Sequence, residues 1–300
     1  MISIECRKQL AGATGHLQLN VQMQIEQGAF VTLFGASGAG KTSLLRMLAG
    51  LTQPDSGRIE VGGEVWFDSE KRLSLSPQQR LVGVVFQDYA LFPNLTVAEN
   101  VAYALHKSQL SQAPRLMALT GLSQLSDRLP ANLSGGQKQR VALARALARV
   151  LPVPGATMAA KKSSLLLLDE PLSALDAALR GQLQDELLML HREFGLTTLL
   201  VSHDIGEVFK LSQQVFVLEH GKILHSGSPA EVFLQQPSQG KLNLQAQVLA
   251  IRKEDVVFIL SLVVGQDIVE IIASHDEVAH LQVGQRIAIS AKAFSPMLFT

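Results

Sequence analysis

The first part of the chain alternates hydrophobic and polar positions. Between Leu17 and Ile25 every second residue is apolar, which is the period of a half-buried β-strand. A similar alternation at residues 2–6 comes before a break that contains Gly12 and Gly15. The first 26 residues therefore predict an antiparallel β-hairpin.

From Phe30 onward the pattern changes to short, continuous apolar runs. Runs of this kind are typical of strands buried on both faces of a mostly parallel α/β sheet, and they occupy Phe30–Phe34, Val82–Phe86, Leu165–Leu168, Thr198–Val201 and Val215–Leu218. The segment Ala177–Phe194 has leucines at helical spacing with polar residues between them, and it predicts an amphipathic helix.

A polar segment with Pro237 and Gly240 ends this pattern. Short runs rich in Val and Ile follow it, and they predict strands at Leu244–Ile251, Val256–Leu262, Ile268–Ala273 and Arg286–Lys292. We therefore expect two domains, an α/β domain at residues 1–235 and a small β-domain, built as a barrel, at residues 241–300.

Composition narrows the class of protein. Lys plus Arg and Asp plus Glu number 26 each, so the net charge is zero and a nucleic-acid partner is not expected. The strongest apolar run, Val256–Val264, is interrupted by Ser261 and is far shorter than the roughly 20 residues of a spanning helix. The first residues lack the features of a signal peptide, and the one cysteine cannot form an internal disulfide. The expectation is a cytoplasmic protein that is at most peripheral to a membrane.

A phosphate-binding loop is the strongest chemical signal. Gly35-Ala36-Ser37-Gly38-Ala39-Gly40-Lys41-Thr42 matches the pattern G-x-x-x-x-G-K-[ST], directly after a predicted strand and before a helical stretch that begins at Ser43. Glycines let backbone N–H groups surround phosphate oxygens, and the helix N-terminus favours negative charge. We expect Lys41 to bridge the β- and γ-phosphates of ATP and Thr42 to ligate Mg²⁺.

Two acids end the predicted strand at Leu165–Leu168. Asp169 is expected to hold the Mg²⁺ shell, and Glu170 to polarise the attacking water as a general base. Taken alone, an apolar run followed by Asp-Glu is more often a strand that ends in a solvated turn. The phosphate loop favours the catalytic interpretation.

The segment Leu133-Ser134-Gly135-Gly136-Gln137 resembles the signature motif of the ATP-binding cassette (ABC) ATPases. Ser134 and the N–H groups of Gly135 and Gly136 begin a helix and form a second anion site, although an ordinary helix cap has the same residues. The resemblance implies a head-to-tail dimer, in which each ATP lies between the Lys41 loop of one copy and the Ser134 loop of the other.

Further positions match the family's motifs in the family's order. Gln87 resembles the glutamine that contacts Mg²⁺ or water, Asp176 in Ser173–Asp176 resembles the D-loop aspartate, and His203 resembles the switch histidine at the γ-phosphate. The resemblance implies a P-loop NTPase domain with a mostly parallel sheet, an antiparallel β subdomain and a helical subdomain. It also implies that an OB-like (TOBE/Mop) barrel follows this domain.

Within the family the chain is most similar to ATP-binding subunits of molybdate importers. This resemblance implies membrane permease subunits, an extracytoplasmic substrate-binding protein and a place on the cytoplasmic face of the inner membrane. The segment Asp88–Val101 resembles the part that contacts the permease, with Tyr89, Leu91 and Phe92 as apolar anchors, or else as core residues. Sulfate, sugar or polyamine importers and a soluble, non-transport ABC ATPase are the alternatives.

The sequence does not assign a role to three features. No Phe, Tyr or Trp precedes Phe30, so the usual aromatic partner of adenine is missing and His16 is the nearest ring. The stretch Val150–Ser164 is longer than the family pattern and is expected to be a surface insertion. Ser290 and Lys292 are candidates for an oxyanion site in the second domain, although a lysine at a strand end is usually only solvated.

Overall fold

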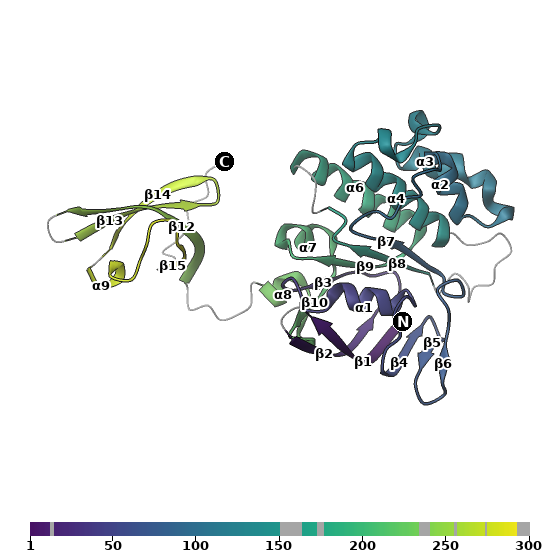
Figure 1. Ribbon diagram of the computed structural model, residues 1–300, viewed down its shortest axis with the longest axis horizontal. Helices are drawn as coiled ribbons and strands as arrows, with labels where there is room; N and C mark the ends of the chain where they lie inside the picture. The colour runs from purple at the N-terminus through teal and green to yellow at the C-terminus, as the bar shows by residue number, and fades with distance from the viewer. Residues whose placement is uncertain are drawn as a thin grey trace. The chain divides into compact units, whose positions relative to one another are not determined.

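A computed structural model describes residues 1–12, 15–150, 164–172, 177–233, 241–254, 257–273 and 275–292 (Figure 1). The chain divides into two units, Met1–Leu234 and Gln235–Thr300. The predicted insertion at 150–164 falls almost wholly on residues 151–163, and the predicted D-loop occupies residues 173–176. Both lie outside the described residues.

One sheet runs through the first unit, in the strand order β6-β5-β4-β1-β2-β11-β10-β3-β9-β8-β7. Its strands, in chain order, are β1 (Ile2–Gly12), β2 (Gly15–Ile25), β3 (Phe30–Phe34), β4 (Ser56–Val61), β5 (Glu64–Asp68), β6 (Leu73–Ser74), β7 (Val82–Val85), β8 (Leu165–Asp169), β9 (Thr197–Ser202), β10 (Gln214–Glu219) and β11 (Lys222–Gly227).

The sheet has a parallel part and an antiparallel part. Strands β10, β3, β9, β8 and β7 pair in parallel, as the apolar runs predict. Strands β1 and β2 form the predicted antiparallel hairpin, with Ile2 opposite Ile25. Strand β4 pairs antiparallel with β1, and β11 joins the two parts because it pairs with both β10 and β2. The predicted α/β class, with an added antiparallel portion, is confirmed.

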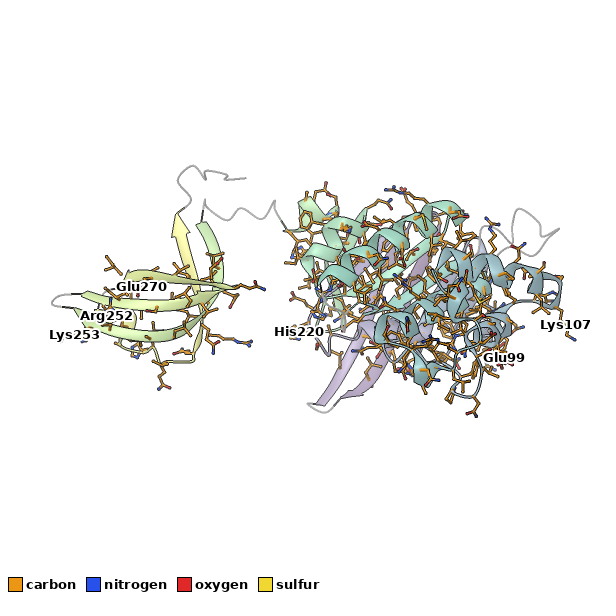
Figure 2. All side chains as sticks on the ribbon, turned by 90° about the horizontal axis from the view of Figure 1, so that it is seen from above. Glu99, Lys107, His220, Arg252, Lys253 and Glu270 are labelled. Atoms are coloured by element: carbon orange, nitrogen blue, oxygen red, sulfur yellow. The ribbon has the colours of Figure 1, made fainter. Side chains whose placement is uncertain are left out.

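Helices cover both faces of the parallel strands (Figure 1). The described helices of this unit are α1 (Lys41–Leu48), α2 (Val97–Ala104), α3 (Ala113–Leu119), α4 (Gly135–Val150), α6 (Ala177–Phe194), α7 (Ile205–Leu211) and α8 (Pro229–Phe233), with short 3-10 turns at Lys107–Gln112, Ser123–Leu125 and Pro130–Asn132. Helices α2 and α3 pack on α4. The predicted helix at 177–194 is confirmed residue for residue as α6. Helix α2 begins with a capping box between Thr96 and Glu99, the latter labelled in Figure 2.

The side chains of β8 alternate between two hydrophobic cores. Leu165 and Leu167 join the core that contains α1 and the β1–β2 hairpin. Leu166 and Leu168 join the core that contains α2, α3, α4 and α6. A strand that is buried on both faces needs this continuous apolar run, because neither face is open to water. Both cores therefore meet on the strand that ends in Asp169.

The second unit contains a four-stranded antiparallel sheet in the order β14-β13-β12-β15. Its elements are β12 (Lys241–Glu254), β13 (Val257–Val264), β14 (Asp267–Ala273), α9 (His275–Val278) and β15 (Arg286–Lys292). The four predicted strands are confirmed, with a small core around Val248, Leu260 and Leu262. Pairing between β14 and β15, which would close a barrel, is not observed among the described residues, so the barrel stays a prediction.

In the part of the chain that the structure describes, no helix combines the length and the apolar character that crossing a membrane requires.

Candidate functional site

The phosphate-binding loop lies between β3 and α1, where the sequence predicts it. Gly40 is the last residue before α1 and has a φ of 104°, in the left-handed region that disfavours other residues. A Cβ atom at this position would lie 2.8 Å from a methyl carbon of Leu19 in β2. The β1–β2 hairpin therefore packs directly against the loop. The backbone angle requires glycine there, and a larger residue would also displace the Leu19 side chain.

Lys41 is held inside this loop. Its ammonium group donates hydrogen bonds to the carbonyl oxygens of Gly35, at 2.7 Å, and Ala36, at 2.9 Å, and the residue is buried. Burial lowers the pKa of Lys41, while the carboxylates of Glu170 and Asp169 act in the opposite direction. The cation is thus held at the phosphate-binding loop by two of the loop's carbonyl oxygens, where it can also meet a phosphate.

Asp169 and Thr42 meet beside the loop, although 127 positions separate them in the chain. The Thr42 hydroxyl donates to Oδ1 of Asp169 at 3.1 Å. Burial is the main cause that raises the pKa of Asp169, and the bond from Thr42 and the charge of Lys41 oppose it. Among the described residues no group of three or more His, Cys, Asp or Glu side chains could hold a metal. A hydroxyl and one carboxylate fit Mg²⁺, which takes few protein oxygens and completes its shell with phosphate and water.

Glu170 follows β8 in a backbone conformation that is rare for a side chain of its kind. Its φ is 46°, and its amide donates to the carbonyl oxygen of Val201 in β9 at 3.1 Å. Left-handed residues other than glycine are strained and concentrate at functional sites. This conformation turns the chain sharply after Asp169, so the two adjacent acids are set in different environments, one buried and one partly exposed.

His203 lies next to Glu170. Its Nδ1 atom is 3.4 Å from Oε1 of Glu170, because β8 and β9 are parallel neighbours and both residues follow the same edge of the sheet. The His203 side chain is 59% exposed and that of Glu170 is 18% exposed, so both can reach a ligand. The structure thus brings together the predicted base and the predicted switch histidine.

A buried network that sequence reasoning missed fixes the turn around His203. The Ser202 hydroxyl donates to Glu207 at 2.6 Å and accepts from the amide of Asp204 at 3.0 Å. Burial raises the pKa of Glu207. Arg180, in the first part of α6, donates to Asp204 at 3.4 Å. The spacing Ser202-x-Asp204-x-x-Glu207 is the available signal, because Asp204 caps α7.

Gln87 is exposed in the turn that follows β7. Val85 pairs with Leu168, so the ends of β7 and β8 lie at the same edge of the sheet. Gln87 therefore follows its strand at the edge where Asp169 follows β8.

Ser134 caps helix α4. Its hydroxyl accepts from the amide of Gln137 at 3.3 Å, and its own amide donates to Oε1 of Gln137 at 2.9 Å. A Cβ atom on Gly136 would lie 2.6 Å from a methyl carbon of Leu179, so α4 packs closely on α6 at this point. Ser134 is thus confirmed as the cap of α4. Because Ser134 and Gly135 are exposed at a helix N-terminus, they can also bind an anion.

The three predicted apolar anchors have different environments. Tyr89 and Leu91 pack partly buried against the core of the helical part, as the core interpretation predicts. Phe92 is exposed and lines a groove of about 600 Å³. Tyr103 of α2, which sequence reasoning missed, is 68% exposed in the same groove, and its ring lies 4.5 Å from that of Phe92.

Some predicted positions cannot be placed. Asp176 lies outside the described residues, and so do the side chains of His16, Ser290 and Lys292. For Ser290 and Lys292 only the backbone is described, in β15, opposite Asn243 and Lys241 of β12.

Comparison with known protein families gives one match. The model of the ABC transporter family matches residues 19–173, which is the part that contains the phosphate loop, Ser134 and Asp169.

Several curated proteins have similar sequences. A probable sulfate/thiosulfate import ATP-binding protein of Chlorella vulgaris is 44% identical over 71% of this chain and 85% of its own length. A spermidine/putrescine import ATP-binding protein of Chromobacterium violaceum is 43% identical, over 71% of this chain and 56% of its own. The molybdenum import ATP-binding protein of Escherichia coli K12 is also 43% identical, over 73% and 59%. The match thus spans little more than half of the last two relatives.

Solved structures of ABC cassettes have the same fold. A bacterial ABC transporter cassette, solved as a dimer, superposes with a TM-score of 0.62 at 28% identity, over 76% of this chain and 99% of that one. CbiO1 of Clostridium perfringens, part of an ABC transporter complex, gives a TM-score of 0.63 at 28% identity, over 78% and 91%.

Proposed function

The chain belongs to the ABC transporter family, and we propose that it is the ATP-hydrolysing subunit of an importer. One observation carries this proposal. The phosphate loop with Lys41, the Thr42–Asp169 pair and the Glu170–His203 pair all lie at one edge of the parallel part of the sheet. Binding of a nucleotide's phosphates and activation of water can therefore occur at adjacent points.

Each residue has a distinct role in the proposed reaction. Lys41 and the N–H groups of residues 35–43 bind the phosphates, and Thr42, Asp169 and Gln87 hold Mg²⁺. The metal ion, when bound, neutralises charge on the phosphate oxygens. Glu170 accepts a proton from the attacking water, and His203 contacts the γ-phosphate and orients Glu170. Catalysis consists mainly of positioning and charge stabilisation.

The proposed active form contains two copies of the chain. Ser134, Gly135, Gly136 and Gln137 of one copy would bind the ATP held by the Lys41 loop of the other, with Asp176 between them. The exposed N-terminus of α4 supports this proposal, because its first N–H groups are directed away from the helix and can bind an anion. A related cassette was solved as a dimer.

We propose that the other partners are permease subunits in the membrane and, indirectly, an extracytoplasmic substrate-binding protein. The chain would then lie on the cytoplasmic face of the inner membrane. The groove with Phe92 and Tyr103 supports this proposal, since exposed aromatic side chains beside a concave surface suit a helix of a partner protein.

For the transported substrate we propose molybdate or the similar tungstate. The 43% identity with a molybdenum import ATP-binding protein supports this cargo, and the small β-sheet unit after the cassette fits importers of oxyanions, sugars and polyamines alike. The similar relatives are sulfate/thiosulfate, spermidine/putrescine and molybdenum import proteins, so sulfate and polyamines are the alternative cargoes, with sugars as a further alternative. A non-transport ABC ATPase is the alternative outside import.

A tagged Glu170→Gln chain loaded with Mg-ATP, used to capture partners from detergent-solubilised membranes, tests the importer. We expect a polytopic permease and its substrate-binding protein, identified by mass spectrometry. Titration of that binding protein with molybdate, tungstate, sulfate and spermidine then identifies the cargo. Capture of ribosomal or DNA-associated proteins alone would contradict import, and absent phosphate release by the wild-type chain would contradict the ATPase role.

A further inference from the structure

Helix α4 is capped by Ser134 and carries, in its second half, an arginine that binds the turn after Gln87. The guanidinium of Arg145 donates to the carbonyl oxygen of Ala90 at 2.7 Å and to that of Tyr89 at 2.9 Å. The same group lies over the ring of Phe92, 5.4 Å from its centre. One side chain therefore contacts three residues of the segment that follows Gln87.

The turn that Arg145 binds is strained. Tyr89 has a φ of 60° and Ala90 a φ of 43°, so two consecutive residues other than glycine are left-handed. Such residues persist only where their surroundings hold them. Within the turn, the amide of Tyr89 donates to the carbonyl oxygen of Phe86 at 2.9 Å. Gln87 lies between these two residues, so its position depends on whether the turn keeps its shape.

Helix α4 is also in direct contact with β7, the strand that leads to Gln87. A Cβ atom on Gly83 would collide with the carbonyl oxygen of Ala146, the residue after Arg145. One turn further along, Arg149 donates to the carbonyl oxygens of Gln78, at 2.6 Å, and Arg80, at 3.2 Å. Helix α4 thus holds the segments before and after β7. Of these two arginines, Arg149 binds the segment before the strand and Arg145 binds the segment that contains Gln87.

We propose that Arg145 is a positioning residue that ties the Gln87 turn to helix α4, so that Gln87 and the Ser134 end of α4 move together. This inference rests on the proposed function, because only in that function does Gln87 help to hold Mg²⁺ at the ATP site. Arg145 and Phe92 also line the groove of about 600 Å³, so an occupant of the groove would touch the group that holds the turn.

A kinetic cycle tests this proposal with the full chain. We compare phosphate release by wild type, Arg145→Lys, Gln87→Ala and the double variant. Lysine keeps the charge but lacks the planar guanidinium fork, so it cannot reproduce the two hydrogen bonds together with the contact over the Phe92 ring. We expect Arg145→Lys to lower kcat about tenfold with less than a twofold change in the KM for ATP, because the Lys41 loop is untouched.

The double variant decides between positioning and general destabilisation. If Arg145 acts through Gln87, the double variant has about the kcat of Gln87→Ala alone, because coupled residues are not additive. Independent losses that multiply in the double variant would overturn the proposal. A Gln87→Ala chain with the full wild-type kcat would also overturn the proposal. The position of Gln87 would then not affect turnover, so Arg145 could not act through it.

Arg149→Lys is the matched control, because it removes the same kind of contact from the same helix, one turn away. We expect it to lower the melting temperature about as much as Arg145→Lys while kcat stays within about twofold of wild type. An equal loss of kcat in both variants would mean that Arg145 only stabilises the fold, and would overturn the proposal.

Hydrogen exchange provides a readout that needs no turnover. In Arg145→Lys we expect amides of residues 87–92 to exchange about tenfold faster, while those of residues 35–48 are unchanged. Unchanged exchange at residues 87–92 would overturn the proposal. A wild-type chain that releases no phosphate would refute the proposed function, and exchange alone would then decide whether Arg145 holds the turn.

Discussion

At the scale of single residues, the site depends on side chains whose surroundings differ from those of ordinary surface groups. Asp169 is buried at a strand end, Lys41 is buried inside a loop, and Glu170 has a left-handed backbone. Each arrangement costs stability, and charged groups are rarely buried without a use. Charged side chains such as these ordinarily stay in contact with water. Their burial or strained backbone therefore indicates a functional role.

Glu170→Gln tests the proposed base. We expect kcat for ATP hydrolysis to fall by about 10²–10⁴-fold, because glutamine cannot accept a proton from water. The affinity for Mg-ATP stays close to that of wild type, since Lys41 and Thr42 are unchanged. Phosphate release and binding of a fluorescent ATP analogue measure the two effects. Glu219→Gln, at an exposed position of β10, is the control, and normal turnover by Glu170→Gln would remove Glu170 from its role.

Asp169→Asn tests the cost of the buried carboxylate. Burial raises the pKa of Asp169 above its unfolded value, so the folded state binds its proton more tightly. The charged form therefore destabilises the fold, increasingly as pH rises through the folded pKa. We expect Asp169→Asn to stabilise the chain by on the order of 1 kcal/mol at pH 8, with the gain disappearing toward pH 4.

Urea unfolding of both chains across that pH range measures the difference, and phosphate release by Asp169→Asn should be lost at the same time. An asparagine variant that is less stable than wild type at pH 8 would show that the carboxylate stabilises the fold.

At the scale of elements, the contact of α4 with β7 is closer than side chains would permit. Gly83→Ala places a methyl group against the carbonyl of Ala146, and we expect it to destabilise the chain by about 1–3 kcal/mol. Gly181→Ala is the matched control, because Gly181 lies within α6 and no heavy atom lies within 4 Å of its Cβ position. That variant should be more stable by about 0.5–1 kcal/mol. Urea midpoints measure both, and equal stability of the two variants would contradict the close packing.

Elements with a strong local pattern could be predicted, and elements with a weak one could not. The hairpin, the parallel strands and α6 follow from periodicity, because burial on one or both faces dictates the pattern. Strands β4 and β5 were missed, although alternation at Arg58–Val61 before Gly62-Gly63 is a hairpin signal. The edge that β4 shares with β1 is a non-local pairing that no short segment indicates.

At the scale of the whole molecule, the proposed two-copy form predicts a change of mass on nucleotide binding. Glu170→Gln with Mg-ATP should double its mass in light scattering. Adding Ser134→Asp should prevent this, because aspartate still caps α4 but places a negative charge where the partner's phosphate would bind. Glu170→Gln with Ser134→Asn keeps a neutral cap and is the control. A dimer that forms equally well with Ser134→Asp would contradict the head-to-tail arrangement.

Residue order alone identifies the phosphate loop, the Ser134 motif and the strand that ends in Asp169-Glu170, because each is a continuous segment whose neighbours dictate its conformation. Only the folded chain brings Thr42 to Asp169, Glu170 to His203 and Arg145 to the turn after Gln87. These partners are far apart in the chain, and they meet because the parallel strands end at one edge and α4 packs on β7. Such contacts depend on the order of strands in the sheet, which is a property of the whole fold and of no single segment.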